Sequence, residues 1–175
     1  PLARAIATEP VAPPPADVLA PDTAAAPAVS VIVPAYNVEK TLAETLDSLL
    51  AQTMTDWEAV VVDDESDDGT AQIAARYAER DGRFRYIRRE NGGASAARNT
   101  GITAARGRWL AFLDGDDWWA SDLLSHLTAL VRDKPDDHLA YCAYIRVTPE
   151  GDHTPPDWCP ELAESPFEVL AERCE

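Results

Sequence analysis

Three carboxylates stand within four residues in the segment Asp114-Gly115-Asp116-Asp117. Like charges at this spacing repel one another and lower stability unless a cation or a basic neighbour lies close to them. The segment follows the apolar run from Trp109 to Leu113, so we do not expect the carboxylates to lie on a freely solvated face. Because hard oxygen ligands suit Mg²⁺ and Mn²⁺, the sequence predicts a divalent-cation site here.

Three other polar segments have the composition of a binding site, although each also has an ordinary structural explanation. Pro34-Ala35-Tyr36-Asn37 follows a β-branched run, and taken alone it favours a strand-to-helix turn in which Asn37 caps the helix. Asp63-Asp64 suits either a ligand contact or a turn. Gly92-Gly93, within Asn91–Asn99, suits either a phosphate cradle or a tight loop.

The elements that must position these segments alternate between strand and helix. Short β-branched or apolar runs predict the strands, and apolar residues at helical spacing predict the helices between them. In chain order we expect a strand at Val29–Val33, a helix at Glu39–Gln52, a strand at Trp57–Val62, a helix at Thr70–Asp81, a strand at Phe84–Arg88, a helix at Ala94–Ala105 and a strand at Trp109–Leu113. This alternation predicts an α/β fold with a Rossmann-like, mostly parallel sheet flanked by helices. The carboxyl ends of parallel strands meet at one edge, where ligands bind, so the four polar segments are expected to converge there.

The remaining segments set the domain boundaries. Residues 1–28 hold seven of the fourteen prolines and few large apolar residues, which predicts a flexible Pro/Ala-rich linker or arm before a single domain at 29–175. After Trp119 we expect a helix capped by Ser121 or Asp122 and running to Val131, a strand at Leu139–Val147, and a helix that begins at the capping box Ser165–Glu168. This last helix has little room before Glu175, so we expect the fold to be truncated at its C-terminus.

Composition excludes several classes of partner. With 15 basic and 31 acidic residues the formal net charge is −16, which argues against nucleic acid and anionic membrane surfaces. Nine of the 15 basic residues fall between Arg76 and Arg108, where they either offset a phosphate ligand or form a solvated helix face and loop. Three widely spaced cysteines, Cys142, Cys159 and Cys174, form neither a disulfide framework nor a zinc motif, which indicates a reducing cytoplasm. No apolar run approaches the ~20 residues of a membrane span, so we expect membrane association, at the inner face, only through other regions.

Taken in the order in which they occur along the chain, the four polar segments resemble the opening of a family-two glycosyltransferase. Enzymes of this family are inverting, metal-dependent and of the GT-A fold. The matching segments are Val31–Asn37, Val60–Thr70, Asn91–Gly107 and Phe112–Trp118, of which the last contains the DxD signature. The resemblance implies a donor-binding half at 29–119 and the start of an acceptor-side half at 120–175. It also implies a nucleotide-sugar donor, with UDP-sugars favoured, a sugar, lipid-linked or protein acceptor, and a role in cell-surface polysaccharide biosynthesis.

The resemblance also assigns roles to individual residues. Asp64 would accept a hydrogen bond from the base edge, Arg98 would lie near the diphosphate or the sugar, and Asp114 would reach sugar hydroxyls. The nucleotide-sugar site as a whole would comprise Pro34, Ala35, Tyr36, Asn37, Asp63, Asp64, Arg98, Asp114 and Gly115, and the metal, Mn²⁺ or Mg²⁺, would be held by Asp116 and Asp117. One departure is Glu65, where the family often has Gly or Asn, and a bulkier acid there would narrow the base pocket.

The reaction implied is displacement at the anomeric carbon by an acceptor hydroxyl, for which a carboxylate must take the proton. No residue matches the family's base; by chemical type alone the candidates are Asp152, Asp157, Glu161 and Glu164. The alternative is therefore a nucleotide-sugar-binding module or pseudoenzyme fragment. Receiver-type signalling domains and haloacid-dehalogenase-like phosphatases fit less well, because their acidic motifs follow the first strand.

Overall fold

The computed structural model describes residues 26–133 and the short strands at 146–147 and 153–154. The chain divides into two compact units, Pro1–Ser121 and Asp122–Glu175. Residues 1–25 of the arm predicted at 1–28, most of the predicted strand at Leu139–Val147, the capping box at Ser165 and all three cysteines lie outside the described residues.

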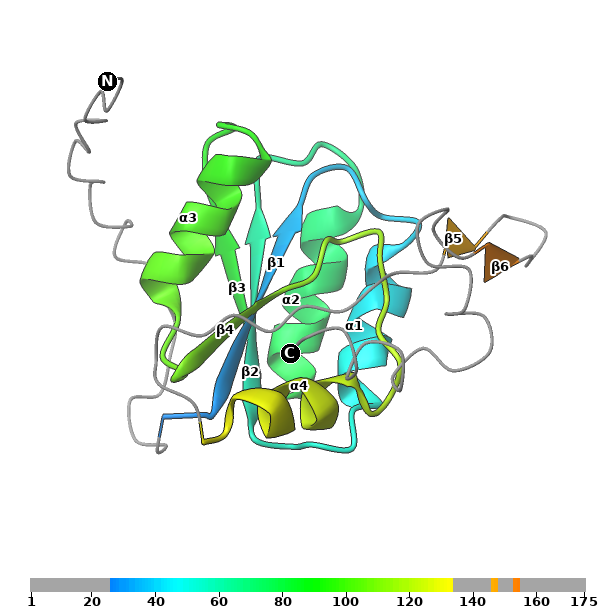
Figure 1. Cartoon of the computed structure of the whole chain (residues 1–175). Helices are drawn as coiled ribbons and strands as arrows, with labels where there is room; N and C mark the ends of the chain where they lie inside the picture. The colour runs from blue at the N-terminus through cyan, green and yellow to red at the C-terminus, as the bar shows by residue number, and fades with distance from the viewer. Residues whose placement is uncertain (1–25, 134–145, 148–152, 155–175) are drawn as a thin grey trace, which may run out of the picture. The chain divides into compact units, whose positions relative to one another are not determined.

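The first unit is built on a four-stranded parallel sheet in the order β3-β2-β1-β4 (Figure 1). Its strands are β1 (Val29–Ala35), β2 (Trp57–Asp63), β3 (Phe84–Arg88) and β4 (Trp109–Phe112), and the connecting helices are α1 (Leu42–Leu50), α2 (Thr70–Arg80) and α3 (Ala94–Ala104). These elements confirm the predicted Rossmann-like α/β fold.

The two faces of the sheet are covered by different helices. Ile32, Val60, Val62 and Ile87 face α3 and form a core with Ala97 of that helix. On the opposite face Tyr77 of α2 packs edge-on against Phe84, which in turn packs against Trp57, and α2 also contacts α1. This double covering explains why the central strands β1 and β2, which are buried along their whole length, are mostly apolar on both faces.

Several boundaries differ from the sequence prediction by one to three residues, and two of them differ for a local reason. β1 continues through Pro34 to Ala35, because β4 ends at Phe112 opposite Ile32 and the missing amide of Pro34 falls beyond the paired part of β4. α1 begins at Leu42 instead of Glu39, because the residues before it bind the turn after β2: Val38 N donates to Thr70 Oγ1 at 2.9 Å, and Glu39 N donates to Asp68 Oδ2 at 3.1 Å.

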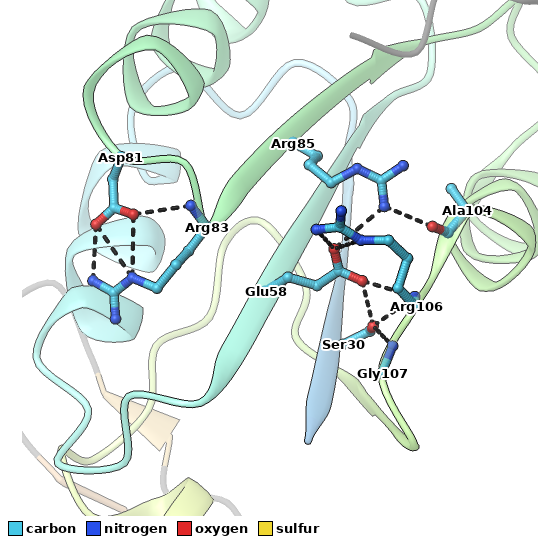
Figure 2. Close-up of polar contacts among 8 residues, drawn as sticks. All are labelled: Ser30, Glu58, Asp81, Arg83, Arg85, Ala104, Arg106 and Gly107. Carbon is cyan, nitrogen blue, oxygen red and sulfur yellow. Dashed lines mark hydrogen bonds and ion pairs between the residues drawn. The ribbon is translucent and has the colours of Figure 1, made fainter. Parts of the chain in front are cut away.

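A buried polar cluster ties the strands together at the amino-terminal edge of the sheet (Figure 2). Glu58 is 2% exposed and accepts hydrogen bonds from Ser30 Oγ at 2.7 Å, from Arg106 N at 2.8 Å and Arg106 Nε at 2.9 Å, and from Arg85 Nη1 at 3.3 Å. Burial alone would raise the pKa of Glu58, but the hydrogen bonds from Ser30 and Arg106 and the charge of Arg106 outweigh it and hold this pKa below its usual value. Glu58 therefore binds as a carboxylate, at the edge opposite the predicted ligand site.

The second unit, described on its own, contains α4 (Leu123–Val131) and an antiparallel pair of β5 (Arg146–Val147) with β6 (His153–Thr154). The helix predicted to reach Val131 is confirmed, and Asp122 occupies its N-cap position. The backbone carbonyl of Asp122, not its carboxylate, accepts from His126 N at 3.1 Å.

Candidate functional site

The carboxyl edge of the sheet brings together the polar segments that follow β1, β2 and β4. Strand register places Ala35, Asp63 and Arg88 side by side. Backbone hydrogen bonds extend this alignment past the strands: Asp64 N donates to Ala35 O at 2.9 Å, and Gly115 N donates to Pro34 O at 3.2 Å. The segment after β1 therefore lies between the acidic pair and the Asp-Gly-Asp-Asp segment.

The two aspartates after β2 are both buried but have different partners. Asp63 is fully buried, and its carboxylate accepts from Ser66 N at 2.8 Å and from Tyr86 Oη at 3.0 Å. Burial, and then the hydrogen bond to Asp63, raise the pKa of Tyr86 to about 12. Both carboxylate oxygens of Asp63 thus accept hydrogen bonds from within the protein, so this residue stabilises the carboxyl edge as part of the scaffold.

Asp64 is held by the loop between β3 and α3. Its carboxylate accepts from Gly93 N at 2.6 Å, from Gly92 N at 3.1 Å and from the guanidinium of Arg89. The amides of Gly92 and Gly93 therefore bind a carboxylate of the chain itself, which decides the question of the glycine pair: in this structure it is no free phosphate cradle. Gly93 adopts φ +84°, a conformation that glycine takes without steric cost.

Asn37 binds the acidic turn after β2 instead of capping a helix. Its backbone lies in the left-handed region at φ 52°, its Oδ1 accepts from Asp67 N at 3.0 Å, and its own N–H donates to Ser66 Oγ at 3.0 Å. The N-cap position of α1 belongs to Thr41, so the cap interpretation of Asn37 is wrong. Asn37 joins the ends of β1 and β2 across the carboxyl edge.

The Asp-Gly-Asp-Asp segment is fixed by two neighbouring helices. Asp114 Oδ1 accepts from Arg98 Nη2 of α3 at 2.5 Å, in an ion pair whose side chains are 34% and 45% exposed. Thr41 and Thr45, at the start of α1, both donate through Oγ1 to Gly115 O at 3.0 Å. A Cβ atom on Gly115 would lie 3.1 Å from Pro34 O, so the segment packs closely against β1.

The two carboxylates that follow Gly115 carry like charges close together in the chain. Asp116 and Asp117 are both exposed, and the pKa of Asp117 is raised by desolvation and then by the like charges of Asp116 and Asp114. A divalent cation would relieve that repulsion. In the part of the chain that the structure describes, no three His, Cys, Asp or Glu side chains converge to hold a metal by themselves.

The aromatic side chains that follow β1 and β4 differ in exposure. Tyr36 is 54% exposed and Trp118 is 47% exposed, so both present apolar surface to solvent. Trp119 is half-buried, and its backbone N–H donates to Ser48 Oγ at 3.2 Å.

Sequence reasoning missed several residues that position this edge. Arg89, which neutralises Asp64, was counted only as one basic residue among nine. Thr45 carries a clear signal in retrospect: it lies on the buried face of α1 with Leu42, Leu46 and Leu49, where a polar residue needs a partner. The basic residues between Arg76 and Arg108 are partly accounted for, since at least five of the nine form ion pairs: Arg83, Arg85, Arg89, Arg98 and Arg106. The four candidate bases between Asp152 and Glu164 lie outside the described residues.

The chain is similar in structure to solved glycosyltransferases. The chain resembles Staphylococcus aureus TarS, with a TM-score of 0.56 and 36% identity over 60% of this chain and 19% of that one. It also resembles the mannosyltransferase PcManGT from Pyrobaculum calidifontis, in complex with GDP-Man and Mn²⁺, with a TM-score of 0.55 and 35% identity over 67% of this chain and 36% of that one. The fold is that of the GT-A glycosyltransferases.

Sequence comparison then gives the family. The family model described as "Glycosyl transferase family 2" matches residues 30–170, and the chain belongs to this family. An uncharacterized glycosyltransferase of Bacillus subtilis, EpsJ, is 52% identical over 58% of this chain and 30% of its own length. Escherichia coli WfgD, a UDP-Glc:α-D-GlcNAc-diphosphoundecaprenol β-1,3-glucosyltransferase, is 41% identical over 55% of this chain and 38% of its own length. The chain thus spans less than two-fifths of either relative.

None of the helices in the described residues is both long enough and apolar enough to cross a membrane.

Proposed function

We propose that this chain binds a nucleotide-diphosphate sugar, with a UDP-sugar favoured, and forms the donor-binding part of an inverting, metal-assisted glycosyltransferase. One observation carries the proposal. This chain belongs to the family, and its segments containing Asp64, Arg98 and Asp114 meet at the carboxyl edge of the sheet. The exposed pair Asp116 and Asp117 follows directly.

The choice of donor is supported by relatives. Structures of S. aureus TarS hold UDP and UDP-GlcNAc, and WfgD is named for UDP-Glc. In this chain Tyr36 would offer its exposed ring to the base. The Asp64 carboxylate has about four lone-pair sites for three donors of the loop, and Gly92 N is shared between its two oxygens at 3.1 and 3.2 Å, so a base edge would take the site that this sharing occupies.

Charge control at the diphosphate falls to Arg98 and the acidic segment. Arg98 is partly exposed and pairs with Asp114, so it can turn toward a diphosphate while Asp114 accepts from sugar hydroxyls. Asp116 and Asp117 suit Mn²⁺ or Mg²⁺, which when bound neutralises charge on the leaving diphosphate. Two carboxylates fit this role, because Mg²⁺ is usually bound by one or two carboxylates together with phosphate oxygens and water.

The acceptor is proposed to be a hydroxyl of a sugar, and the name of WfgD makes a lipid-linked sugar the first to test. Inversion requires a carboxylate that removes the proton of this hydroxyl as it attacks the anomeric carbon.

The test is calorimetry of UDP binding to the full chain with Mn²⁺ and with EDTA. We expect binding to be at least about tenfold weaker in EDTA, equivalent to ~1.4 kcal/mol, because the acidic segment repels a diphosphate unless a cation intervenes. Asp116→Asn should remove most of this difference, whereas Asp56→Asn, an exposed aspartate before β2, should retain it. If UDP binds equally tightly with and without metal, the proposed metal site is wrong. If the chain binds none of UDP, GDP and dTDP, the proposed donor site is wrong.

A further inference from the structure

Glu65 combines an unfavourable backbone conformation with a specific side-chain contact. Its φ is 66°, in the left-handed region where the Cβ of an L-residue is crowded and Gly or Asn is preferred. Its side chain is exposed, so burial does not hold it in place. Its Oε2 accepts from Asn91 N at 3.0 Å, in the loop between β3 and α3.

Three successive backbone amides of this loop point at two successive carboxylates. The amide of Asn91 binds Glu65, and the amides of Gly92 and Gly93 bind Asp64 at 3.1 Å and 2.6 Å. The side chain of Asn91 closes the arrangement, because its Nδ2 donates to Asp64 O at 3.2 Å. Both residues of the turn, Asp64 and Glu65, are therefore hydrogen-bonded to the same short loop.

We propose that Glu65 is a positioning residue for nucleobase recognition: it fixes the loop at residues 89–93, and the loop fixes the carboxylate of Asp64. The inference rests on the proposed function, in which Asp64 accepts from the base edge. It goes beyond that function by assigning a role to a residue outside the donor contacts.

The physical reason lies in the flexibility of the loop. Two adjacent glycines leave this segment many accessible conformations. Without the bond from Asn91 to Glu65, the loop is held mainly through Asp64, so loop and carboxylate move together. A carboxylate that is correctly oriented only part of the time lowers the apparent affinity by that fraction. Glu65 thus preorganises the acceptor before the nucleotide arrives.

The experiment compares three variants of the full chain. Glu65→Asn keeps a residue that tolerates the left-handed conformation, but its side chain is one methylene shorter and loses the reach to Asn91. Glu65→Gln keeps the acceptor oxygen and the length. Glu90→Asn is the matched control, because Glu90 is an exposed glutamate of the same loop whose side chain makes no hydrogen bond within the described residues.

Three quantities are measured: affinity for the nucleoside diphosphate that the parent binds among UDP, GDP and dTDP, amide hydrogen exchange at residues 91–93, and Tm. For Glu65→Asn we expect affinity to fall about fivefold or more and loop amides to exchange faster, while Tm stays the same or rises as backbone strain is relieved. Glu65→Gln and Glu90→Asn should remain within about twofold of the parent in affinity.

The outcomes separate this inference from the proposed function. If the parent binds a nucleotide and Glu65→Asn binds it equally well, or if loop exchange is unchanged, the role of Glu65 is overturned and the donor site stands. A lower Tm with unchanged affinity would make Glu65 a purely structural residue. If the parent binds none of the three nucleotides, the proposed function fails, and the role of Glu65 fails with it.

Discussion

Asp63 and Asp64 are neighbours in the chain and are both buried, yet their carboxylates serve different parts of the molecule. Asp63 accepts from Ser66 N and Tyr86 Oη and so belongs to the scaffold. Asp64 accepts from Arg89 and from the amides of Gly92 and Gly93, on the loop before α3. The reason is geometric: successive residues at the end of a strand point to opposite faces of the sheet. Of the two, Asp64 is the residue whose substitution should change both the stability of the loop and the affinity for the nucleotide.

Asp64→Asn should weaken UDP binding by about 1–3 kcal/mol, the usual cost of losing a hydrogen bond to a charged group, while the metal requirement persists. Stability should fall as well, because Arg89 and two loop amides lose a charged acceptor. Asp67→Asn, an exposed aspartate of the same turn, is the control for charge. Calorimetry with Mn²⁺ gives the affinities, and thermal shift gives the stabilities. If UDP stabilises Asp64→Asn as much as the parent, Asp64 is only a turn residue.

At the scale of elements, close contact between α3 and the sheet decides where the edge lies. A Cβ atom on Gly101 of α3 would lie 2.4 Å from Ile32 Cγ2 and 3.4 Å from Val62 Cγ2, both on fully buried side chains. A Cβ atom on Gly107, just before β4, would lie 2.5 Å from Ser30 N of β1. Glycine at these positions lets α3, which carries Arg98, and β4, which leads to Asp114, approach β1. The ion pair at the site depends on this approach.

Gly101→Ala should therefore lower the free energy of unfolding by about 1–3 kcal/mol through overpacking, although alanine is the better helix former by about 1 kcal/mol. Gly82→Ala is the control, because a Cβ atom there has no neighbour within 4 Å, and its effect should stay within about 0.5 kcal/mol. Urea denaturation measures both. An equally stable Gly101→Ala variant would show that Ile32 can move aside.

The cluster around Glu58 predicts a dependence of stability on pH. Since the folded protein lowers the pKa of Glu58 below its unfolded value of 4.5, the stabilisation is fully present above that value and is lost as the pH falls through the lower, folded pKa. Glu58→Gln should destabilise the protein by about 1–3 kcal/mol at pH 7, because two arginines lose a charged acceptor. Its stability should also decline less between pH 4.5 and pH 3 than that of the parent. Urea titrations across this range measure the difference, and parallel curves would contradict the assignment.

At the scale of the whole molecule, the chain belongs to glycosyl transferase family 2 and covers less than two-fifths of the length of EpsJ or WfgD. The described residues contain the sheet edge that the proposed donor site requires. The carboxylates considered as bases, Asp152, Asp157, Glu161 and Glu164, lie outside them. The described residues therefore bear on binding of the donor and not on activation of the acceptor.

We expect the 175-residue chain to transfer sugar poorly. No residue of the chain matches the family's general base, and a transfer without such a base is typically slower by roughly 10²–10⁴-fold. Slow hydrolysis of the donor, with water in place of the acceptor, is the activity we expect to see. The chain is incubated with UDP-sugars, Mn²⁺ and a panel of acceptor sugars, and both UDP release and glycosidic product are measured. Transfer at ordinary enzyme rates would contradict this expectation, and the four carboxylates named above would then be mutated first.

The order and type of the elements in the first unit can be predicted from the amino-acid sequence alone. Apolar runs such as Trp57–Val62 predicted strands within a residue of their observed ends, because a strand buried on both faces needs a continuous apolar run. The position of Asp63 and Asp114 just after strands also followed, since parallel strands joined by helices must present their carboxyl ends at one edge. These are consequences of local pattern and connectivity.

The partners of each side chain were decided only by the tertiary structure. Arg89 and the loop amides bind Asp64 across 25 or more residues of sequence, and Thr45 binds Gly115 across 70. Periodicity and composition describe each segment separately, and they contain no distances between segments that are far apart in the chain. Whether a glycine pair cradles a phosphate or binds a carboxylate of its own chain depends on those distances, because a hydrogen bond forms only within about 3 Å.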